Sequence, residues 1–489
     1  MKRSIFTKDF ELYYPEGIQP CPMYVDIANK IYNALLVAAP YPKSDCKDIA
    51  INIAIYYEDK MSNIGLWNAF VDKHMQMYSR PLPFFDVDVE DLQRDDVNVD
   101  EVDLLLWLVL SRNHDDQFLN PMAGSRILAD IIMDIILDAD EVQENVGLYN
   151  YIYDKDKAND YFKLKHILLW LQRSYLIYSD LTEDFYNATL DVLEDNFNNE
   201  KAEYYASTRV SMYCEIGPLA LLAHLWLAQM YDNNNMHDEA KKLENVRYST
   251  HELYMVTDAD TEYATLTDAL GGSYRMKNEY PKLLQVNNCV GTALVKYGDL
   301  DWEVNGVMFL ANSSSFANVR KQREMSRKER EIALPLYLKK TNGKQIAFFE
   351  NKKQTIKWLK EITGMNDTKQ FEKEMESNNY VTFITEQGSI AFSPGIVHAV
   401  KCDHNPYYRK CDEDDLQTEA ITAVLDFVSV QPEVLQYLLK NNMLCDGDIS
   451  CRTPSDSGKQ IFFQNIDFIA RNARRHKYHY NPEEEWREL

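Results

Sequence analysis

A continuous apolar segment near the N-terminus constrains the fold more than any other feature of the sequence. Between Ile49 and Tyr57 the only polar residue is Asn52. A helix over this segment leaves no face for water, so it must be packed on several sides. We predict a buried helix that begins at Ser44, whose side chain can cap the first turn. The helix ends at the charged residues 58–60, and a helical domain is expected to form around it.

The spacing of apolar residues changes along the chain. Helical patterns recur up to about residue 270, and the last of them is predicted over residues 260–270. Turn signals between short apolar segments then predict antiparallel hairpins, one over residues 333–350 around Asn342-Gly343 and one over residues 380–393 around residues 386–388. A charged helix is predicted over residues 316–331. The pattern therefore indicates strands and helices in the second half of the chain.

The predicted fold class is α+β. A mainly helical N-terminal domain, residues 1–275, is followed by a C-terminal domain of antiparallel hairpins and helices, residues 276–489, with a further division near residue 365. More than one domain is expected, because single cores rarely grow beyond about 250–300 residues and the chain has 489. Its 45% hydrophobic content and 12% aromatic content are enough for packed cores.

Charge and cysteine content indicate the compartment. The formal net charge of −25 opposes binding to nucleic-acid backbones and anionic membranes. No apolar run approaches the roughly 20 residues that a membrane-spanning helix needs, and no signal-peptide pattern is present. The eight cysteines form no Cys-x-x-Cys pair, which is typical of reduced thiols. The sequence predicts a cytoplasmic protein without a membrane contact.

Signatures of common catalytic sites do not occur. Phosphate-binding glycine loops, His-Glu-x-x-His and Gly-x-Ser-x-Gly are all missing from the sequence, and no cofactor is predicted. The candidate catalytic residues are Glu58 and Asp59, with Trp67 as a candidate binding residue beside them. Asp48 and Asp59 lie roughly 16 Å apart along a helix, beyond the ~5–9.5 Å of glycosidase carboxylate pairs. Glu58 and Asp59 alternatively end a buried helix without chemistry.

One group of side chains has the residue types of a zinc site. His398, Cys402, His404 and Cys411 are all zinc-ligand types, and two of them are four residues apart. Their spacing matches no zinc module, and no Cys-x-x-Cys pair anchors them. The sequence therefore predicts no bound metal, and these four residues are the candidates if one is bound.

Basic residues gather in two stretches of this acidic chain. The first, residues 320–330, contains the candidate binding residues Arg320, Lys321, Arg323 and Arg327. Glutamates interrupt it, which favours a surface helix docked on the acidic N-terminal part. The second stretch, residues 471–479, interleaves bases with tyrosines, a composition that suits stacking on single-stranded nucleic acid. Acidic residues follow it directly, so nucleic acid is the less favoured partner.

Several short stretches spread over the chain form a further pattern. They are residues 48–59 (DIA through YED), 65–70 (GLWNAF), 102–107 (VDLLLW), 405–408 (NPYY) and 438–444 (LLKNNML). Together they resemble an uncharacterised family from gut Bacteroidetes that is filed only as a domain of unknown function. The resemblance implies a soluble bacterial protein and brings no activity, substrate or catalytic residue with it.

The leading functional hypothesis is a non-enzymatic cytosolic interaction or regulatory protein with another protein as its partner. Its contact elements are acidic N-terminal surfaces and the basic helix at residues 316–331. The first alternative is a hydrolase with Glu58 and Asp59 in a pocket between elements. The second is nucleic-acid binding through residues 320–330 and 471–479. The ligand and the oligomeric state stay open at this stage.

Overall fold

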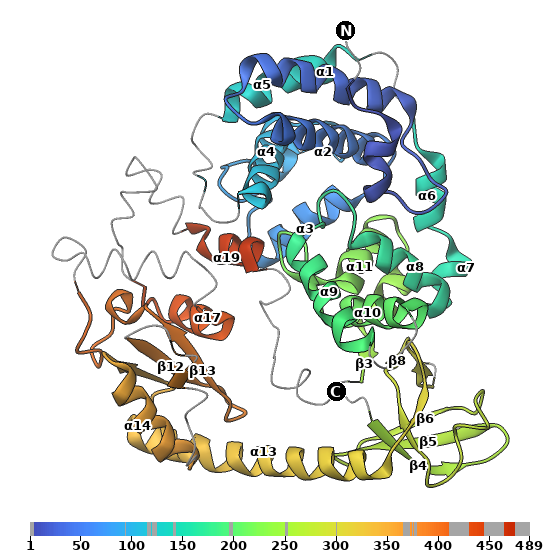
Figure 1. The fold of residues 1–489 in the computed structure, drawn as a ribbon. Coiled ribbons are helices and arrows are strands. Elements are labelled where there is room, and N and C mark those ends of the chain that lie inside the picture. The colour runs from blue at the N-terminus through green and yellow to red at the C-terminus, as the bar shows by residue number, and fades with distance from the viewer. Residues whose placement is uncertain are drawn as a thin grey trace.

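The computed structural model shows N-terminal helices, followed by antiparallel sheets interleaved with helices (Figure 1). This arrangement confirms the α+β fold class. The structure describes residues 4–92, 94–114, 119, 125–139, 143–194, 199–249, 253–299, 301–364, 372–373, 375, 379–409, 430–444 and 464–474.

The helices of the first half are η1 (Thr7–Tyr13), α1 (Pro22–Ala38), α2 (Lys43–Met61), α3 (Leu66–Tyr78), η2 (Val89–Asp91), α4 (Val99–Asn113), α5 (Ser125–Leu137), α6 (Val146–Ile152), α7 (Lys155–Ala158), α8 (Tyr161–Leu171), α9 (Asp180–Glu194), α10 (Asn199–Tyr213), α11 (Ala223–Asn233) and α12 (His237–Glu244). Those of the second half are α13 (Ser313–Lys340), α14 (Lys352–Thr363), η3 (Val397–Ala399), α17 (Pro432–Lys440) and α19 (Ile466–Arg474). None of these described helices is both long and apolar enough to cross a membrane.

The strands are β1 (Glu215–Ile216), β2 (Leu221–Leu222), β3 (Arg247–Tyr248), β4 (Leu253–Ala259), β5 (Tyr263–Asp268), β6 (Ser273–Lys277), β7 (Cys289–Gly291), β8 (Leu294–Lys296), β9 (Glu303–Val304), β10 (Phe309–Ala311), β11 (Ile346–Phe349), β12 (Tyr380–Ile384) and β13 (Ile390–Pro394). The largest sheet has the order β10-β7-β4-β5-β6, and smaller sheets are β3-β8-β9, β11-β12-β13 and β1-β2. All pairings between these strands are antiparallel.

Helix α2 lies in the middle of the helical part, as its sequence predicts, and α1, α3 and α4 pack against it. Ile49 and Ile53 are fully buried. Asn52 is also buried and donates to the Asp48 carbonyl one turn earlier. The predicted cap is wrong. The helix follows Pro42 and begins at Lys43 without a side-chain cap, which places Ser44 inside the first turn.

The predicted secondary structure is wrong for two segments. Residues 260–270 do not form a helix, because β5 alternates buried and half-buried side chains with a period of two and pairs with β4. Residues 333–340 are not a strand, because Ala333 and Tyr337 are buried one helical turn apart in α13. Asn342 and Gly343 both have positive φ, but they end this helix and lead into β11. The hairpin over residues 380–393 is confirmed as β12 and β13.

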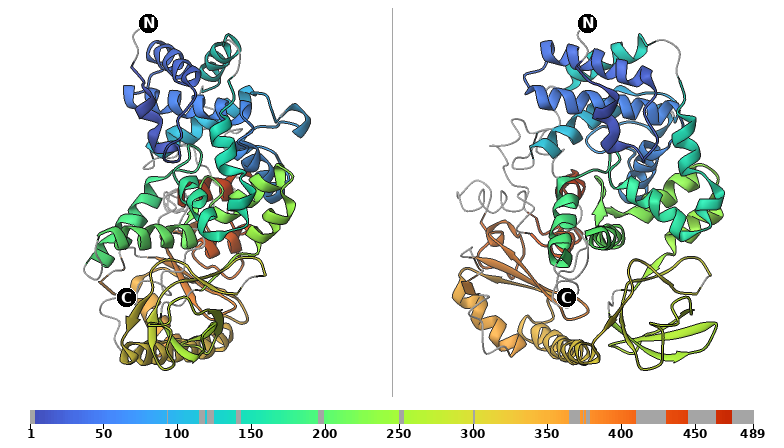
Figure 2. Two further views of the ribbon diagram at one scale, coloured as in Figure 1. Left: turned by 90° about the vertical axis from the view of Figure 1, so that its right-hand side faces the viewer. Right: turned by 45° about the vertical axis from the view of Figure 1, so that its right-hand side comes forward.

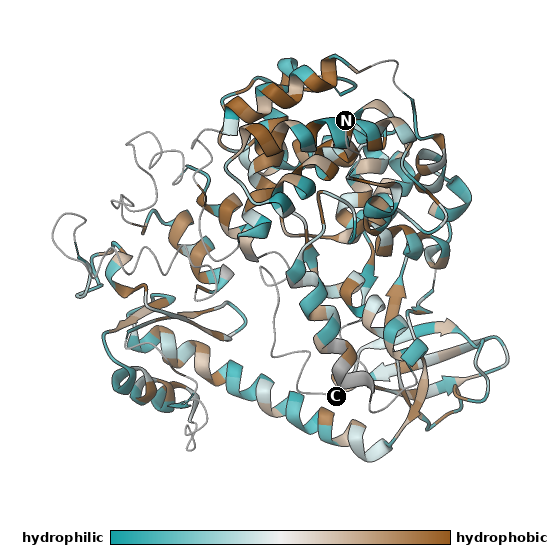
Figure 3. Cartoon of the chain, turned by 45° about the horizontal axis from the view of Figure 1, so that its top comes forward, coloured by the Kyte–Doolittle hydropathy of each residue, from teal (hydrophilic) through white to brown (hydrophobic). Residues whose placement is uncertain are grey.

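Helix α13 connects the two sheet regions. It has 28 residues and lies between the sheet of β4 to β6 and the sheet of β11 to β13 (Figures 1 and 2). Hydrophilic side chains predominate along its middle (Figure 3). The helix packs against β4 near its start and against α14 near its end. The division of the chain near residue 275, which lies within β6, stays a prediction.

The chain returns to its N-terminal helices at α19. The ring of Phe468 contacts the rings of Phe70, His74, Phe84 and Trp107. The carboxylate beside it, that of Asp467, accepts a hydrogen bond from Tyr78 at 2.6 Å. Helix α19 thereby completes an aromatic part of the core that α3 and α4 begin.

Candidate functional site

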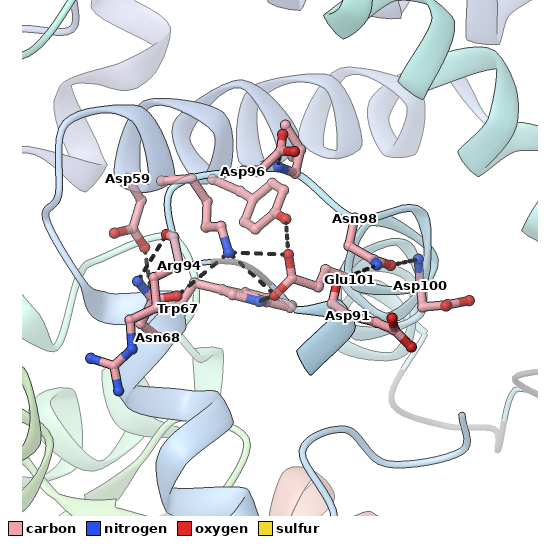
Figure 4. A network of polar contacts seen from close by, with 12 residues as sticks. Asp59, Trp67, Asn68, Asp91, Arg94, Asp96, Asn98, Asp100 and Glu101 are labelled. Atoms are coloured by element: carbon pink, nitrogen blue, oxygen red, sulfur yellow. Dashed lines mark hydrogen bonds and ion pairs between the residues drawn. The ribbon is translucent and has the colours of Figure 1, made fainter. Parts of the chain in front are cut away.

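A network of buried polar side chains surrounds the end of α2 (Figure 4). Lys60 Nζ lies 3.3 Å from Glu101 Oε2, and both side chains are 1% exposed. Glu101 also accepts hydrogen bonds from Tyr56 Oη at 2.5 Å and Trp67 Nε1 at 2.7 Å. Burial raises the pKa of the Glu101 carboxyl, and the Lys60 ammonium opposes that rise. The candidate binding residue Trp67 thus has its polar atom bound within the protein.

Asp59 caps helix α3 from outside that helix. Its carboxylate accepts from the backbone N–H groups of Leu66 at 3.1 Å and Trp67 at 2.8 Å, and from Tyr175 Oη at 2.8 Å. The residue at the cap position of α3 is Gly65, which has no side chain for this purpose. Burial raises the pKa of Asp59, while these three hydrogen bonds lower it. The carboxylate therefore performs a helix-capping role.

Glu58 joins α2 to two other segments. It accepts hydrogen bonds from Tyr14 Oη, from Cys21 N at 2.9 Å and from Asn145 Nδ2 at 3.0 Å. Glu58 is 1% exposed and Asp59 is 3% exposed. Burial raises the pKa of Glu58, and its three hydrogen-bond donors counter the rise. Internal contacts account for both carboxylates, and the hydrolase hypothesis built on them stays a prediction.

Replacing Asp59 with alanine tests this capping role. We expect Asp59→Ala to lower the free energy of unfolding by about 2–3 kcal/mol, because two helix N–H groups and a buried phenol lose their acceptor. Urea denaturation followed by circular dichroism measures the loss. The matched control is Asp72→Ala, which removes a half-exposed carboxylate bound to exposed Arg94 and should change the same quantity by less than about 0.5 kcal/mol. Equal losses in the two variants would contradict the role.

The basic candidates on α13 face in different directions. Arg320 and Arg327 line a cavity of about 280 Å³ beside Thr257 and Thr267 of the largest sheet. Arg320 Nε donates to Glu324 at 3.1 Å, and Arg327 Nε lies 3.6 Å from Glu331. Lys321 is exposed outside that cavity, and Arg323 is half-buried. Glutamates of the same helix therefore neutralise part of this basic stretch.

The zinc candidates are only partly brought together. Cys402 Sγ lies 2.9 Å from His404 Nδ1. His398 is buried, and its Nδ1 is 2.8 Å from the Tyr407 carbonyl oxygen. Cys411 and residues 475–479 of the second basic stretch lie outside the described residues. Within the described part of the chain, no three His, Cys, Asp or Glu side chains are grouped to hold a metal ion.

The structure also contains a cavity that no sequence pattern predicts. It has a volume of about 590 Å³ and lies between residues 12–16 and helices α8, α9 and α10. Its lining consists of Leu12, Tyr14, Pro15, Glu16, Tyr151, His166, Leu169, Trp170, Gln172, Arg173, Tyr178, Ser179, Thr182, Glu183, Tyr186, Asn187, Ser207 and Val210. None of these residues belongs to a motif, and nothing in local spacing joins residue 14 to residue 170.

Two polar groups at the wall of this cavity are buried without a partner. Gln172 is 8% exposed and Thr182 is 7% exposed. Among the described residues, neither Gln172 Nε2 nor Thr182 Oγ1 has a hydrogen-bond partner. A buried polar group without a partner costs about 1–3 kcal/mol. Because both residues line the cavity, a rotation of either side chain would offer its polar group to a molecule bound there.

Aromatic rings form much of the remaining wall. Trp170 Nε1 donates to the Tyr13 carbonyl, and Tyr14 Oη donates to Glu58, so both polar ends are bound by the protein. The Tyr151 ring meets Trp170 edge to face, with centroids 6.3 Å apart. Charged side chains of both signs also line the cavity, namely Arg173, Glu16 and Glu183, and the imidazole of His166 lies beside them. The cavity thus combines apolar rings with neutral hydrogen-bonding groups and charges of both signs.

The fold and this cavity define a mixed α+β protein whose helical part holds a cavity of ligand size. The chain belongs to the family described as "Protein of unknown function (DUF3843)", whose model matches residues 4–279 and 301–475. Neither a curated protein nor a solved structure matches the chain. The resemblance to a family of unknown function that spans most of the chain is thereby confirmed.

Proposed function

We propose that this protein acts by binding a small polar molecule in the cavity between residues 12–16 and helices α8, α9 and α10. The observation that carries the proposal is the pair of buried, unpartnered groups, Gln172 Nε2 and Thr182 Oγ1. The volume of about 590 Å³ falls within the roughly 300–1,000 Å³ of ligand pockets. We place this activity in the bacterial cytosol, as part of a regulatory or interaction protein.

The cavity wall indicates the chemistry of the ligand. The rings of Tyr14 and Trp170 favour a molecule with a flat apolar face. Gln172 Nε2 can only donate, so the ligand needs an acceptor oxygen or nitrogen at its edge. Because the charged lining residues are of both signs, we propose a ligand without a large net charge.

A regulatory role follows from the position of the cavity. Tyr14 lines it and also donates to Glu58 at the end of α2, so the wall is connected to the centre of the helical part. Helix α9 contributes Thr182, Glu183 and Tyr186 from its first turns. A bound molecule would therefore fix α9 against α8 and α10. Hydrolysis and nucleic-acid binding stay alternative predictions without a supporting contact of this kind.

The variants Gln172→Leu and Thr182→Val test the proposal through two effects of opposite sign. Each removes an unpaired polar group at nearly constant volume, so each should leave the empty protein as stable as before or more stable by up to about 1 kcal/mol. Each should also weaken ligand binding at least tenfold, since about 1.4 kcal/mol of hydrogen-bond energy is lost. A metabolite library screened by thermal shift, with Trp fluorescence titrations of the hits, measures both quantities.

Gln322→Leu is the matched control, because it makes the same change on the exposed surface of α13. It should bind the hits as the parent protein does. Unchanged affinity in both cavity variants, or a loss of stability in both, would contradict the proposal.

A further inference from the structure

Lys165 is a buried lysine without an acidic partner. It lies on α8, is 3% exposed, and points toward α10. Its Nζ is 2.5 Å from Thr208 Oγ1 and 3.1 Å from Tyr204 Oη, and it lies 4.2 Å from the centroid of the Tyr204 ring. No carboxylate among the described residues pairs with it. The amine is therefore held by hydroxyl groups and an aromatic ring alone.

This environment disfavours the ammonium form. Burial lowers the pKa of Lys165 to about 7, with no opposing charge contribution. The elements packed against α8 include α10 and α11, whose buried ionisable side chains in this region are Arg209 and His224. Neither can act as a counterion to a lysine. A neutral lysine amine at physiological pH is a nucleophile, unlike the ammonium groups of surface lysines.

Access to the amine depends on one side chain. Tyr204 is 40% exposed, and its ring covers Lys165 Nζ, which is itself buried. A rotation of the Tyr204 side chain would bring the amine into contact with solvent. Exposed aromatic side chains change rotamer on short timescales, so this cover is compatible with entry of a small molecule.

A further buried polar residue lies near the amine. Asn305 is fully buried, and its amide interacts with the Tyr161 hydroxyl group. Its neighbour Gly306 lies close to Thr208. A Cβ atom built at Gly306 would stand 3.6 Å from Thr208 Cγ2. Thr208, whose hydroxyl group contacts Lys165 Nζ, thus borders a second buried polar group, the amide of Asn305.

We propose that Lys165 is a site of covalent modification by small carbonyl compounds, which enter by displacement of the Tyr204 ring. The amine lone pair attacks the carbonyl carbon of an aldehyde, and the carbonyl oxygen receives the proton that the nitrogen gives up. The resulting carbinolamine loses water to form an imine, without any oxidant or reductant. The Thr208 hydroxyl, which stays in place when the Tyr204 ring moves, is close enough to Nζ to relay the proton. This site is separate from the cavity proposed for ligand binding.

Limited reductive alkylation tests the proposal. The full-length protein is treated with propanal and cyanoborohydride at several pH values, and each labelled lysine is identified by peptide mass spectrometry. At pH 7 about half of the Lys165 side chains are neutral, against roughly 1 in 3,000 for an ordinary lysine, a difference of about 10³-fold. We expect Lys165 to label at least tenfold faster than Lys163, with a rate that rises through pH 7.

Lys163 is the internal control, since it lies on the same helix with its side chain 59% exposed. Its labelling rate should rise only toward pH 10. Tyr204→Ala should accelerate labelling of Lys165 at least fivefold and leave Lys163 unchanged, and Tyr204→Phe should keep the cover. Labelling of Lys165 no faster than Lys163 in the parent protein would overturn the proposal, and this comparison needs no variant. An unchanged rate in a folded Tyr204→Ala protein would overturn the role of Tyr204.

Discussion

Glu101→Leu is expected to lower the free energy of unfolding of the helical part by about 4 kcal/mol. The substitution removes the carboxylate beside Lys60, whose side chain is 1% exposed, and breaking a buried ion pair from one side costs about 3–5 kcal/mol. Tyr56 Oη and Trp67 Nε1 lose their acceptor in the same step. Urea denaturation followed by circular dichroism and tryptophan fluorescence measures the loss.

A second substitution separates the charge effect from the lost hydrogen bonds. Adding Lys60→Met to Glu101→Leu should recover about 2 kcal/mol, since the double variant buries no ammonium group. Glu361→Leu is the control, because it breaks an ion pair between half-exposed side chains, Lys340 and Glu361, with an expected loss below about 1 kcal/mol. A double variant that is no more stable than Glu101→Leu would contradict a paired charge at this position.

Lys165→Met is expected to stabilise the protein, and by an amount that depends on pH. The pKa of Lys165 is lowered from 10.5 to about 7 in the folded state. Between these two values the unfolded chain binds a proton that the folded chain does not, so stability rises with pH in this window. At pH 7 and below, this difference between the two pKa values destabilises the folded parent protein by about 4–5 kcal/mol. Lost hydrogen bonds to Thr208 and Tyr204 offset part of the gain, which leaves about 2–3 kcal/mol at pH 6.

Urea denaturation at pH 6, 8 and 10 checks this expectation. The gain of Lys165→Met over the parent protein should be largest at pH 6, smaller at pH 8 and absent at pH 10, where the lost hydrogen bonds outweigh the remaining charge effect. Lys163→Met, an exposed substitution on the same helix, should show no such trend. A destabilised Lys165→Met protein at pH 6, or a gain that is the same at all three pH values, would contradict a buried neutral lysine.

The sequence predicts those features of the fold that depend on local pattern. The apolar segment around Ile49 and Ile53 predicts the central helix, because continuous burial is visible in composition alone. The hairpin of β12 and β13 follows from two short apolar segments that a glycine turn separates. Residues 333–340 mislead, since a short apolar segment before Asn342-Gly343 imitates a strand, while neighbouring elements bury Ala333 and Tyr337 on one helical face. Tertiary packing decides whether this segment forms a strand or a helix.

The candidate sites were less accessible to sequence analysis. The sequence offers Glu58 and Asp59 as catalytic candidates, and that role stays a prediction. Their partners Tyr14, Asn145 and Tyr175 come from distant segments that no local rule identifies. The same holds for the cavity, where residues 12–16 meet α8 to α10. A buried group without a partner, such as Gln172 Nε2, is a property of the folded chain alone. The sequence around Lys165 likewise does not show that this lysine has no carboxylate partner among the described residues.

The return of α19 to the N-terminal helices has a consequence for how the chain folds during synthesis. Arg80 and Gln464 are hydrogen-bonded although 384 residues separate them, and Phe468 fills a site made by Phe70, Phe84 and Trp107. These aromatic rings leave the ribosome long before their partner and stay partly uncovered until it arrives. Contacts of such sequence separation form slowly, and exposed aromatic surface on a waiting intermediate favours aggregation. We therefore expect helix α19 to dock late in nascent-chain folding, and we expect a chaperone to be most useful in the interval before it docks.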